Sequence, residues 1–206
     1  MTISRTPARK AAETRRDEIV AVVLELLAEG DVSAVSTPAI ARRVGVTQSA
    51  LYKHFRSKED IWRAVMDVIA VDVGGRLRQA MQTDGSRADR LFAILAAYLS
   101  AVLEIPAIPA LMFAGEVRAL DGASYLREEI SQRFGWFHSA LAEQIRAGQT
   151  DGEFRSDFDA QAAAALAAGI AQSAILRWRL GGNRIDMMGD ARMAFPIFLA
   201  GVRATS

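Results

Sequence analysis

Apolar residues recur at helical spacing along almost the whole chain, and the two-residue alternation that is typical of strands is nearly absent. One such stripe comprises Ile19, Val23, Leu26 and Leu27. The pattern predicts an all-α fold of about nine helices without an internal repeat. Because hydrophobic residues make up 51% of the 206 residues, these helices can bury the core of one large or two small domains.

Start and stop signals divide this pattern into separate helices. Thr37 is the expected N-cap of the second helix, with Pro38 at its first position, and Ser57 is the expected cap of the fourth. Pro196 is expected to kink or break the last helix. The expected helices cover residues 9–29, 37–44, 47–55, a longer stretch from 57, 86–105, 110–120, 124–147, 159–180 and 186–203.

Two of the short helices meet at Gly45, where a sharp turn often needs a positive φ. Thr47 can cap the second of them, and Leu51 and Phe55 lie four residues apart on one face. The side chains left pointing outward are Gln48, Ser49, Tyr52 and Lys53. A helix that enters the major groove by its N-terminal end needs such a small and polar first turn, so the segment predicts a helix-turn-helix.

The distribution of charge fits contact with a polyanion. Residues 33–58 carry five basic residues and no acid, although the net charge of the whole chain is only +1. A solvated basic face has the same composition, so charge alone leaves both interpretations open. An N-terminal arm that could reach a neighbouring groove contains Arg5, Arg9, Lys10, Arg15 and Arg16.

Other classes of function find little support in the sequence. The chain has no cysteine and two histidines, which leaves no zinc site of the usual kind, and it lacks dinucleotide-binding, P-loop and nucleophile-elbow motifs. We therefore expect no enzyme, no metal and no cofactor. The longest uncharged run, residues 160–176, is too short and too rich in alanine to span a bilayer, and no export signal is visible, so a cytoplasmic protein without membrane contact is expected.

The segment TPAIARRVGVTQSALYKHFRSKEDIW resembles the DNA-binding domain of the TetR family of bacterial transcriptional repressors. The likeness covers about residues 13–65 and implies a DNA-binding domain over residues 9–60. The phosphate contacts that it implies are Thr37, Tyr52, His54 and Lys58. The residues that it places against bases are Gln48, Ser49, Ala50 and Lys53, and Thr47 completes the expected DNA-binding set. Many members have glycine or proline in place of Ser49, so the base preference does not carry over.

Residues 75–206 carry no sharp motif, but their layout resembles the C-terminal domain of this family, which binds a small molecule and forms the dimer. The resemblance implies that helices 159–180 and 186–203 join a second copy in a four-helix bundle; the alternative is that the alanine-rich helix is buried within one subunit. An apolar or aromatic effector is expected among the helices of residues 86–147. Candidate lining residues, each of which could instead be core, are Tyr98, Met112, Phe113, Glu116, Trp136, Phe137 and His138.

These features predict a homodimeric, sequence-specific transcriptional regulator. Resemblance to the family implies a repressor, which an unknown small-molecule effector releases from a pseudo-palindromic operator on double-stranded DNA. The alternative is a helical ligand-binding or interaction protein that keeps the fold but does not bind an operator. Lys53, Lys58 and the acid-free basic segment favour DNA binding.

Overall fold

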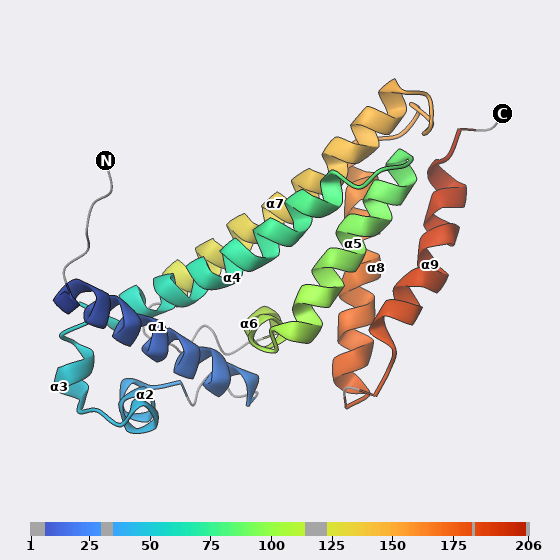
Figure 1. The fold of residues 1–206 in the computed structure, drawn as a ribbon. Coiled ribbons are helices and arrows are strands. Elements are labelled where there is room, and N and C mark those ends of the chain that lie inside the picture. Colours follow the sequence, from blue (N-terminus) through green and yellow to red (C-terminus); the bar gives the residue numbers. More distant parts are fainter. Residues whose placement is uncertain (1–6, 30–34, 114–122, 183, 205–206) are drawn as a thin grey trace, which may run out of the picture. The chain divides into compact units, whose positions relative to one another are not determined.

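Nine α-helices account for nearly all regular structure in the residues that the computed structural model describes, namely 7–29, 35–113, 123–182 and 184–204 (Figure 1). They are α1 (Pro7–Ala28), α2 (Thr37–Val44), α3 (Gln48–Leu51), α4 (Lys58–Met81), α5 (Arg87–Glu104), α6 (Ala107–Phe113), α7 (Ala123–Thr150), α8 (Ala160–Leu180) and α9 (Met187–Val202). The predicted all-α fold is confirmed. Within the described ranges no helix is both long and apolar enough to cross a membrane.

The chain forms two compact units. The first unit holds Met1–Ile69 and Ile105–Ile130, and the second holds Ala70–Glu104 and Ser131–Ser206. In the first unit α1 packs against α2 and α6, while α2 packs against α3. The stripe on α1 supplies this packing, because its predicted apolar residues are all buried. Burying each such side chain contributes about 1.5–3 kcal/mol to folding.

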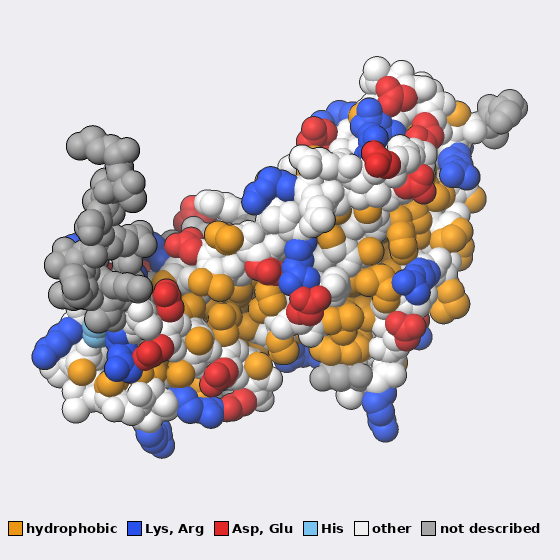
Figure 2. Space-filling view, in the orientation of Figure 1, with side chains coloured by type: hydrophobic (Ala, Val, Ile, Leu, Met, Phe, Trp, Pro, Cys, Tyr) orange, Lys and Arg blue, Asp and Glu red, His pale blue; other side chains and the backbone are white. Residues whose placement is uncertain are grey.

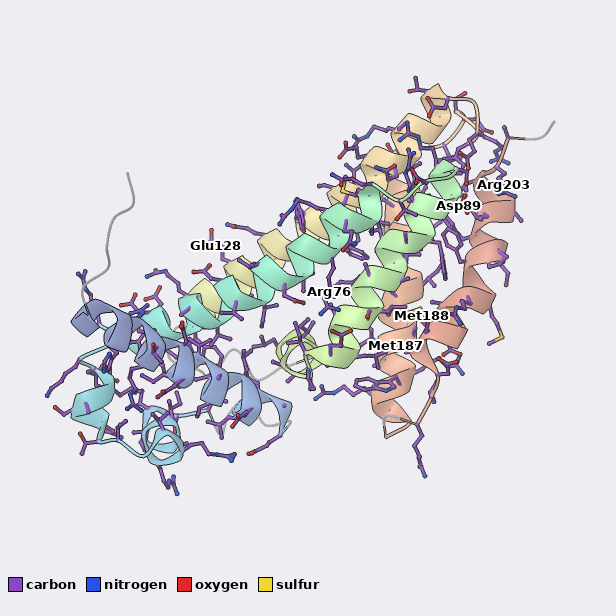
Figure 3. All side chains as sticks on the ribbon, viewed as in Figure 1. Arg76, Asp89, Glu128, Met187, Met188 and Arg203 are labelled. Carbon is purple, nitrogen blue, oxygen red and sulfur yellow. The ribbon has the colours of Figure 1, made fainter. Side chains whose placement is uncertain are left out.

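The second unit is built around α5, α8 and α9, which pack against one another. Alanines on one face of α8 are fully buried, and their small side chains let neighbouring helices approach closely. Arg76 of α4 binds Asp72 at 2.7 Å and Glu104 of α5 at 2.5 Å, and its hydrogen bond holds the pKa of Glu104 below the usual range (Figure 3). Figure 2 shows hydrophobic side chains gathered along α5 and α9 on one face of this unit.

The connector between α7 and α8 contacts the start of α5 and the residue after the end of α9. Phe154 is buried against Gly148, where an added Cβ would lie only 2.2 Å from the ring of Phe154. The Glu153 carboxylate accepts hydrogen bonds from the backbone N–H groups of Arg87 and Ala88, at 2.7 and 3.0 Å, and so caps α5. An isolated bridge pairs Phe154 with Arg203 beyond the end of α9.

The start of α2 differs by one residue from the prediction. Ser36, and not Thr37, is the N-cap, since its side-chain oxygen accepts a hydrogen bond from the Ala39 N–H at 3.3 Å. Thr37 is therefore the first residue of the helix and Pro38 the second. The first N–H groups of a helix have no partner within it, so proline is tolerated at either the first or the second position. The place of Pro38 therefore does not show whether Ser36 or Thr37 is the cap.

The start of α6 also departs from the prediction, and two helices continue through residues that weaken a helix. Helix α4, for which no end was predicted, continues through Gly74 and Gly75, although each costs about 1 kcal/mol relative to alanine in a helix interior. Helix α6 begins at Ala107 and not at residue 110, so Pro109 lies in its first turn, where it costs no helical hydrogen bond. Helix α9 runs through Pro196 to Val202, so of the two expected effects of this proline a break is excluded. Residues 114–122 of the expected helix 110–120 lie outside the described residues.

Candidate nucleic-acid interface

The turn between α2 and α3 depends on a left-handed glycine. Gly45 has φ 77° and ψ 32°, as the sequence predicted for this position. The Val46 N–H donates to the Ala41 carbonyl at 2.9 Å, which closes the end of α2 and satisfies one of its terminal carbonyls. A side chain at position 45 would strain this backbone, even though no atom lies within 4 Å of where its Cβ would stand.

Helix α3 begins as predicted and ends earlier. Thr47 is its N-cap, because its side-chain oxygen accepts a hydrogen bond from the Ala50 N–H at 3.1 Å. Regular helix stops at Leu51, where the prediction had residue 55, and a turn continues to Phe55, whose N–H donates to the Leu51 carbonyl at 3.2 Å. Leu51 and Phe55 are both buried, so they anchor this short helix and its turn to the first unit.

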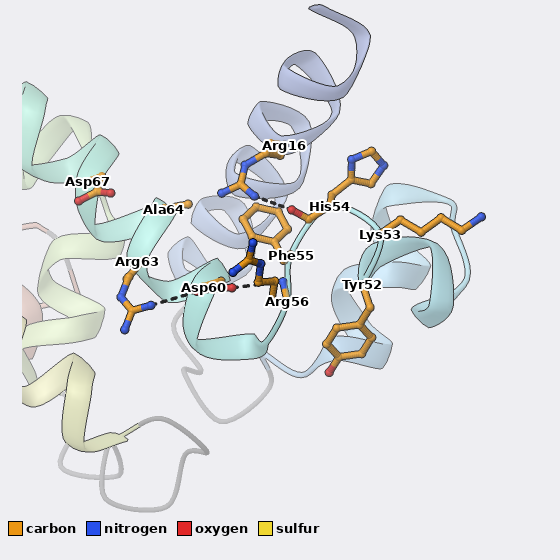
Figure 4. A pocket seen from close by; sticks show the side chains of 10 residues that line it. All are labelled: Arg16, Tyr52, Lys53, His54, Phe55, Arg56, Asp60, Arg63, Ala64 and Asp67. Carbon is orange, nitrogen blue, oxygen red and sulfur yellow. Dashed lines mark hydrogen bonds and ion pairs between the residues drawn. The ribbon is translucent and has the colours of Figure 1, made fainter. Parts of the chain in front are cut away.

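The side chains between these anchors face solvent. Thr47, Gln48, Ser49, Tyr52 and Lys53 are exposed, and Ala50 and His54 are half-buried. Tyr52, at 45% exposure, is not a core aromatic. Tyr52, Lys53 and His54 spread outward from the turn after α3 (Figure 4). The first unit therefore presents a surface of small, polar and basic side chains around the start of α3.

Two other predicted DNA contacts stand at helix N-termini, where backbone N–H groups favour anions. Thr37 is the first residue of α2, and Lys58 is the first residue of α4; both side chains are half-buried. The predicted cap of α4 is confirmed, since the Asp60 N–H donates to the Ser57 hydroxyl at 3.2 Å. A lysine opposes the dipole at a helix start, so Lys58 does not serve the helix itself.

One residue of the interface was placed incorrectly by sequence reasoning. Arg16 was assigned to a free arm, but its guanidinium lies 4.1 Å from the centre of the Phe55 ring and donates a hydrogen bond to the His54 carbonyl (Figure 4). Its neighbour Arg15 pairs with Glu18 at 2.6 Å. A surface groove of about 460 Å³ runs beside the Arg16 contact, and its walls include Lys53 and residues of α4. No local sequence signal indicates this contact, because His54 lies 38 residues from Arg16 and Phe55 is the residue after it.

The side chains of Arg9 and Lys10, and Arg5 as a whole, lie outside the described residues.

Three of the seven candidate effector residues come together in the second unit. The Tyr98 and Phe137 rings stack with their centres 4.4 Å apart, and His138 lies edge-on to Phe137 at 6.1 Å. Tyr98 and Phe137 are buried, and burial raises the pKa of the Tyr98 phenol above its usual value. The cluster thus joins apolar walls to two side chains that can hydrogen-bond.

The other four candidates lie elsewhere. Trp136 is 42% exposed, and its ring rests against α4 at Gly74. Met112 and Phe113 belong to α6 in the first unit, with side chains outside the described residues. Glu116 also lies outside the described residues. Over the part of the chain that the structure describes, no three histidine, aspartate or glutamate residues gather so as to hold a metal ion.

Helices α8 and α9 share an exposed apolar face, which we call the α8–α9 face. It bears four large side chains that are each at least two-thirds exposed: Leu166, Leu180, Met193 and Ile197. A groove of about 420 Å³ between the two helices is lined by small residues such as Gly169 and Ala194. The opposite, alanine-rich side of α8 is buried within the subunit, so this helix has one covered and one uncovered face.

Two family descriptions match the chain. Residues 19–65 match the bacterial regulatory proteins of the tetR family, and residues 87–194 match the tetracyclin repressor-like C-terminal domain. The nucleoid occlusion factor SlmA of Aliivibrio fischeri (strain MJ11) is 28% identical over 173 residues, which cover 71% of this chain and 87% of that protein.

Solved structures share the fold at low identity. A putative transcriptional regulator from Saccharomonospora viridis in complex with choline superposes with a TM-score of 0.76 at 20% identity, covering 94% of this chain and 100% of that one. The regulator FadR from Bacillus subtilis in complex with stearoyl-CoA gives a TM-score of 0.74 at 16% identity, covering 90% and 98%. The arrangement of helices is therefore that of known regulators.

Proposed function

The chain belongs to the TetR family of bacterial regulatory proteins, since one matching domain alone spans more than half of its residues, and we propose that it is a repressor released from its operator by a small-molecule effector. It is a DNA-binding transcriptional regulator with a helix-turn-helix at its N-terminal end. The exposed first turn of α3, capped by Thr47 and anchored by Leu51 and Phe55, is the observation that supports the proposal.

In this proposal residues 9–60 bind DNA and divide their contacts between bases and phosphates. The side chains that approach bases are Gln48, Ser49, Ala50 and Lys53. The side chains that hold phosphates are Thr37, Tyr52, His54 and Lys58. Thr47 caps α3 and so fixes the position of its first turn. The exposure of α3 and the two helix N-termini support this division, because base edges need small or polar partners and phosphates favour N–H groups and cations.

A second copy of the chain is the proposed occupant of the α8–α9 face. Four exposed, large apolar side chains on one face are costly in water, and burying them in a four-helix bundle removes that cost. The two-fold axis of such a dimer presents two α3 helices to one side of a duplex. An operator for it is a pseudo-palindrome whose half-sites lie about 34–36 Å apart, or a multiple of that distance.

Residues 75–206 are the proposed site of effector binding and dimerisation. The stacked pair of Tyr98 and Phe137, with His138 beside it, supports an effector with an apolar or aromatic body and a polar group. To release most of the operator, the effector must prefer the shape that does not bind DNA by up to about 10⁴-fold. We further propose a cytoplasmic protein without enzymatic activity, metal or cofactor.

The alternative function keeps the fold and loses operator binding. Such a protein has no need for a basic residue among the exposed side chains of α3 and its turn, whereas Lys53 is exposed there and Lys58 begins α4. To decide, the purified protein is mixed with sheared genomic DNA of its source at low salt, and bound fragments are sequenced. The proposal expects a few enriched segments that share an inverted repeat. Recovery in proportion to input would favour the alternative.

Replacing Lys58 with alanine is expected to weaken binding to all duplexes alike. Each lost phosphate contact lowers the slope of log affinity against log salt by about 0.9, so a dimer loses about twice that. Fluorescence anisotropy of the recovered operator and of an unrelated duplex, over a series of salt concentrations, measures both effects. The exposed Arg78→Ala variant on the same helix is the matched control, and a slope that Lys58→Ala leaves unchanged contradicts the phosphate role.

A further inference from the structure

We propose that Arg16 is a positioning residue for DNA binding, which holds the recognition turn, residues 52–54, in the conformation that docks. This inference rests on the proposed function, because the turn carries three of the side chains assigned to DNA. Arg16 lies on α1, and its guanidinium stacks on Phe55 at 4.1 Å while it donates to the carbonyl of His54 (Figure 4). One side chain thus fixes both the last carbonyl of the turn and the anchor that follows it.

The recognition turn needs such support because α3 is short. Regular helix spans only four residues, and the turn that follows is held by bonds from Lys53 to Ala50 and from His54 to Leu51, at 3.2 and 3.0 Å. Bonds between residues three apart have poorer geometry than those of an α-helix, and terminal carbonyls need partners from elsewhere. A hydrogen bond from a distant helix therefore adds a restraint that the turn's own backbone bonds do not supply.

Among the described residues, the contacts of Arg16 are with a ring and a carbonyl, and no ion pair with an acid is found. Asp60 also lines the groove, and its two oxygens accept from the Arg56 backbone N–H at 3.2 Å and from Arg63 at 3.0 Å. Arg16 is held instead by a ring face and a carbonyl oxygen. A flat guanidinium can stack on the ring while it donates to the carbonyl, and the compact ammonium of lysine does not reproduce this planar geometry.

The contacts of Arg16 allow a positioning role to be distinguished from a phosphate-binding role. A phosphate-binding arginine contributes its charge, so lysine keeps the salt dependence of binding and a neutral side chain lowers it. A positioning arginine acts through its shape. Without it the turn samples other conformations, and the apparent affinity falls in proportion to the population that can still dock. Losing one exposed ring contact and one charged hydrogen bond corresponds to about a 30-fold loss for each subunit, hence about a thousandfold for a dimer.

The test compares Arg16→Lys and Arg16→Gln with Arg78→Gln, which removes an exposed arginine charge outside the proposed DNA-binding residues and so is the matched control. Operator affinity is measured over a salt series, at a temperature well below the thermal unfolding midpoint of each variant. We expect Arg16→Lys and Arg16→Gln to bind about equally weakly, Arg16→Lys to keep the wild-type salt slope, and Arg78→Gln to bind as the wild type does. Wild-type affinity in Arg16→Lys would overturn the proposal, and so would a lowered slope in Arg16→Gln that lysine restores.

Hydrogen exchange of the protein without DNA is a second test, which does not depend on operator binding. Faster exchange of the amides of residues 52–55 in Arg16→Lys, with α5 and α8 unchanged, is the expected result. Wild-type exchange rates in that segment would show that Arg16 does not hold the turn and would overturn the inference. Failure of the wild-type protein to bind any duplex would instead refute the proposed function, and the exchange result would still decide whether Arg16 restrains the turn.

Discussion

Replacing Ile197 with aspartate is expected to convert the dimer into monomers and to weaken operator binding by about 10²–10⁴-fold. Ile197 is 76% exposed on α9, so the substitution should not disturb the fold of a single subunit. In the proposed bundle the same position is buried in both copies, and an unpaired charge there costs several kcal/mol for each copy. Two linked heads gain their affinity from effective concentration, which monomers lose.

Size-exclusion chromatography with light scattering measures the first effect, and anisotropy with the recovered operator measures the second. Leu103→Asp is the matched control, because it places the same charge at a half-exposed apolar position on α5, outside the α8–α9 face. That variant should remain dimeric. A dimer that survives Ile197→Asp at micromolar concentration would show that the second copy does not cover this face.

Replacing Leu51 with alanine is expected to remove about 2–5 kcal/mol from the stability of the first unit and to abolish specific binding while the dimer remains. Leu51 is fully buried, and it is the last residue of α3, so a cavity at this point releases the helix from its support. Because the α8–α9 face belongs to the second unit, dimerisation should be unaffected.

Urea unfolding followed by circular dichroism, together with operator binding, checks the consequence for Leu51→Ala. Leu103→Ala supplies the same change in chemistry at a half-exposed position, where the loss should be much smaller. An unfolding curve for Leu51→Ala that overlaps that of the wild type would contradict the role of Leu51 as the anchor of α3.

The features that sequence reasoning predicted correctly are local ones. The cap at Thr47, the left-handed Gly45 and the buried pair of Leu51 and Phe55 each depend on residues within four positions along the chain. A side-chain oxygen caps a helix because free N–H groups lie beside it, and two apolar residues four apart lie on one helical face. Both features can therefore be predicted from neighbouring residues alone. The order and type of the helices follow from the same short-range signals.

The features that it missed depend on contacts between distant segments. Arg16 meets a carbonyl 38 residues further on, and Glu153 caps a helix 66 residues before it. The ring of Trp136 packs against α4 at Gly74, which is a further contact between distant segments. Spacing along the chain contains no information about such pairs.

The same difference between local and distant contacts applies to the two candidate sites. The expected DNA-binding residues are adjacent in sequence, and most of them gather around α3 and its turn. The effector residues were chosen by residue type along three expected helices, and the structure groups only Tyr98, Phe137 and His138. Trp136 is adjacent to Phe137 in sequence but points to another face of α7, because successive residues of a helix differ in direction by about 100°.

Cross-linking from a single cysteine tests most directly whether the exposed face of α3 enters the major groove. The chain has no cysteine, so Ser49→Cys introduces its only thiol, and Ser156→Cys places one on an exposed loop of the second unit as the control. Each variant is incubated with operator duplexes that carry a disulfide-activated thiol tethered to a base in the major groove. We expect position 49 to form the cross-link within each half-site and position 156 to form none. Equal yields from the two positions, or none from position 49, would contradict docking by α3.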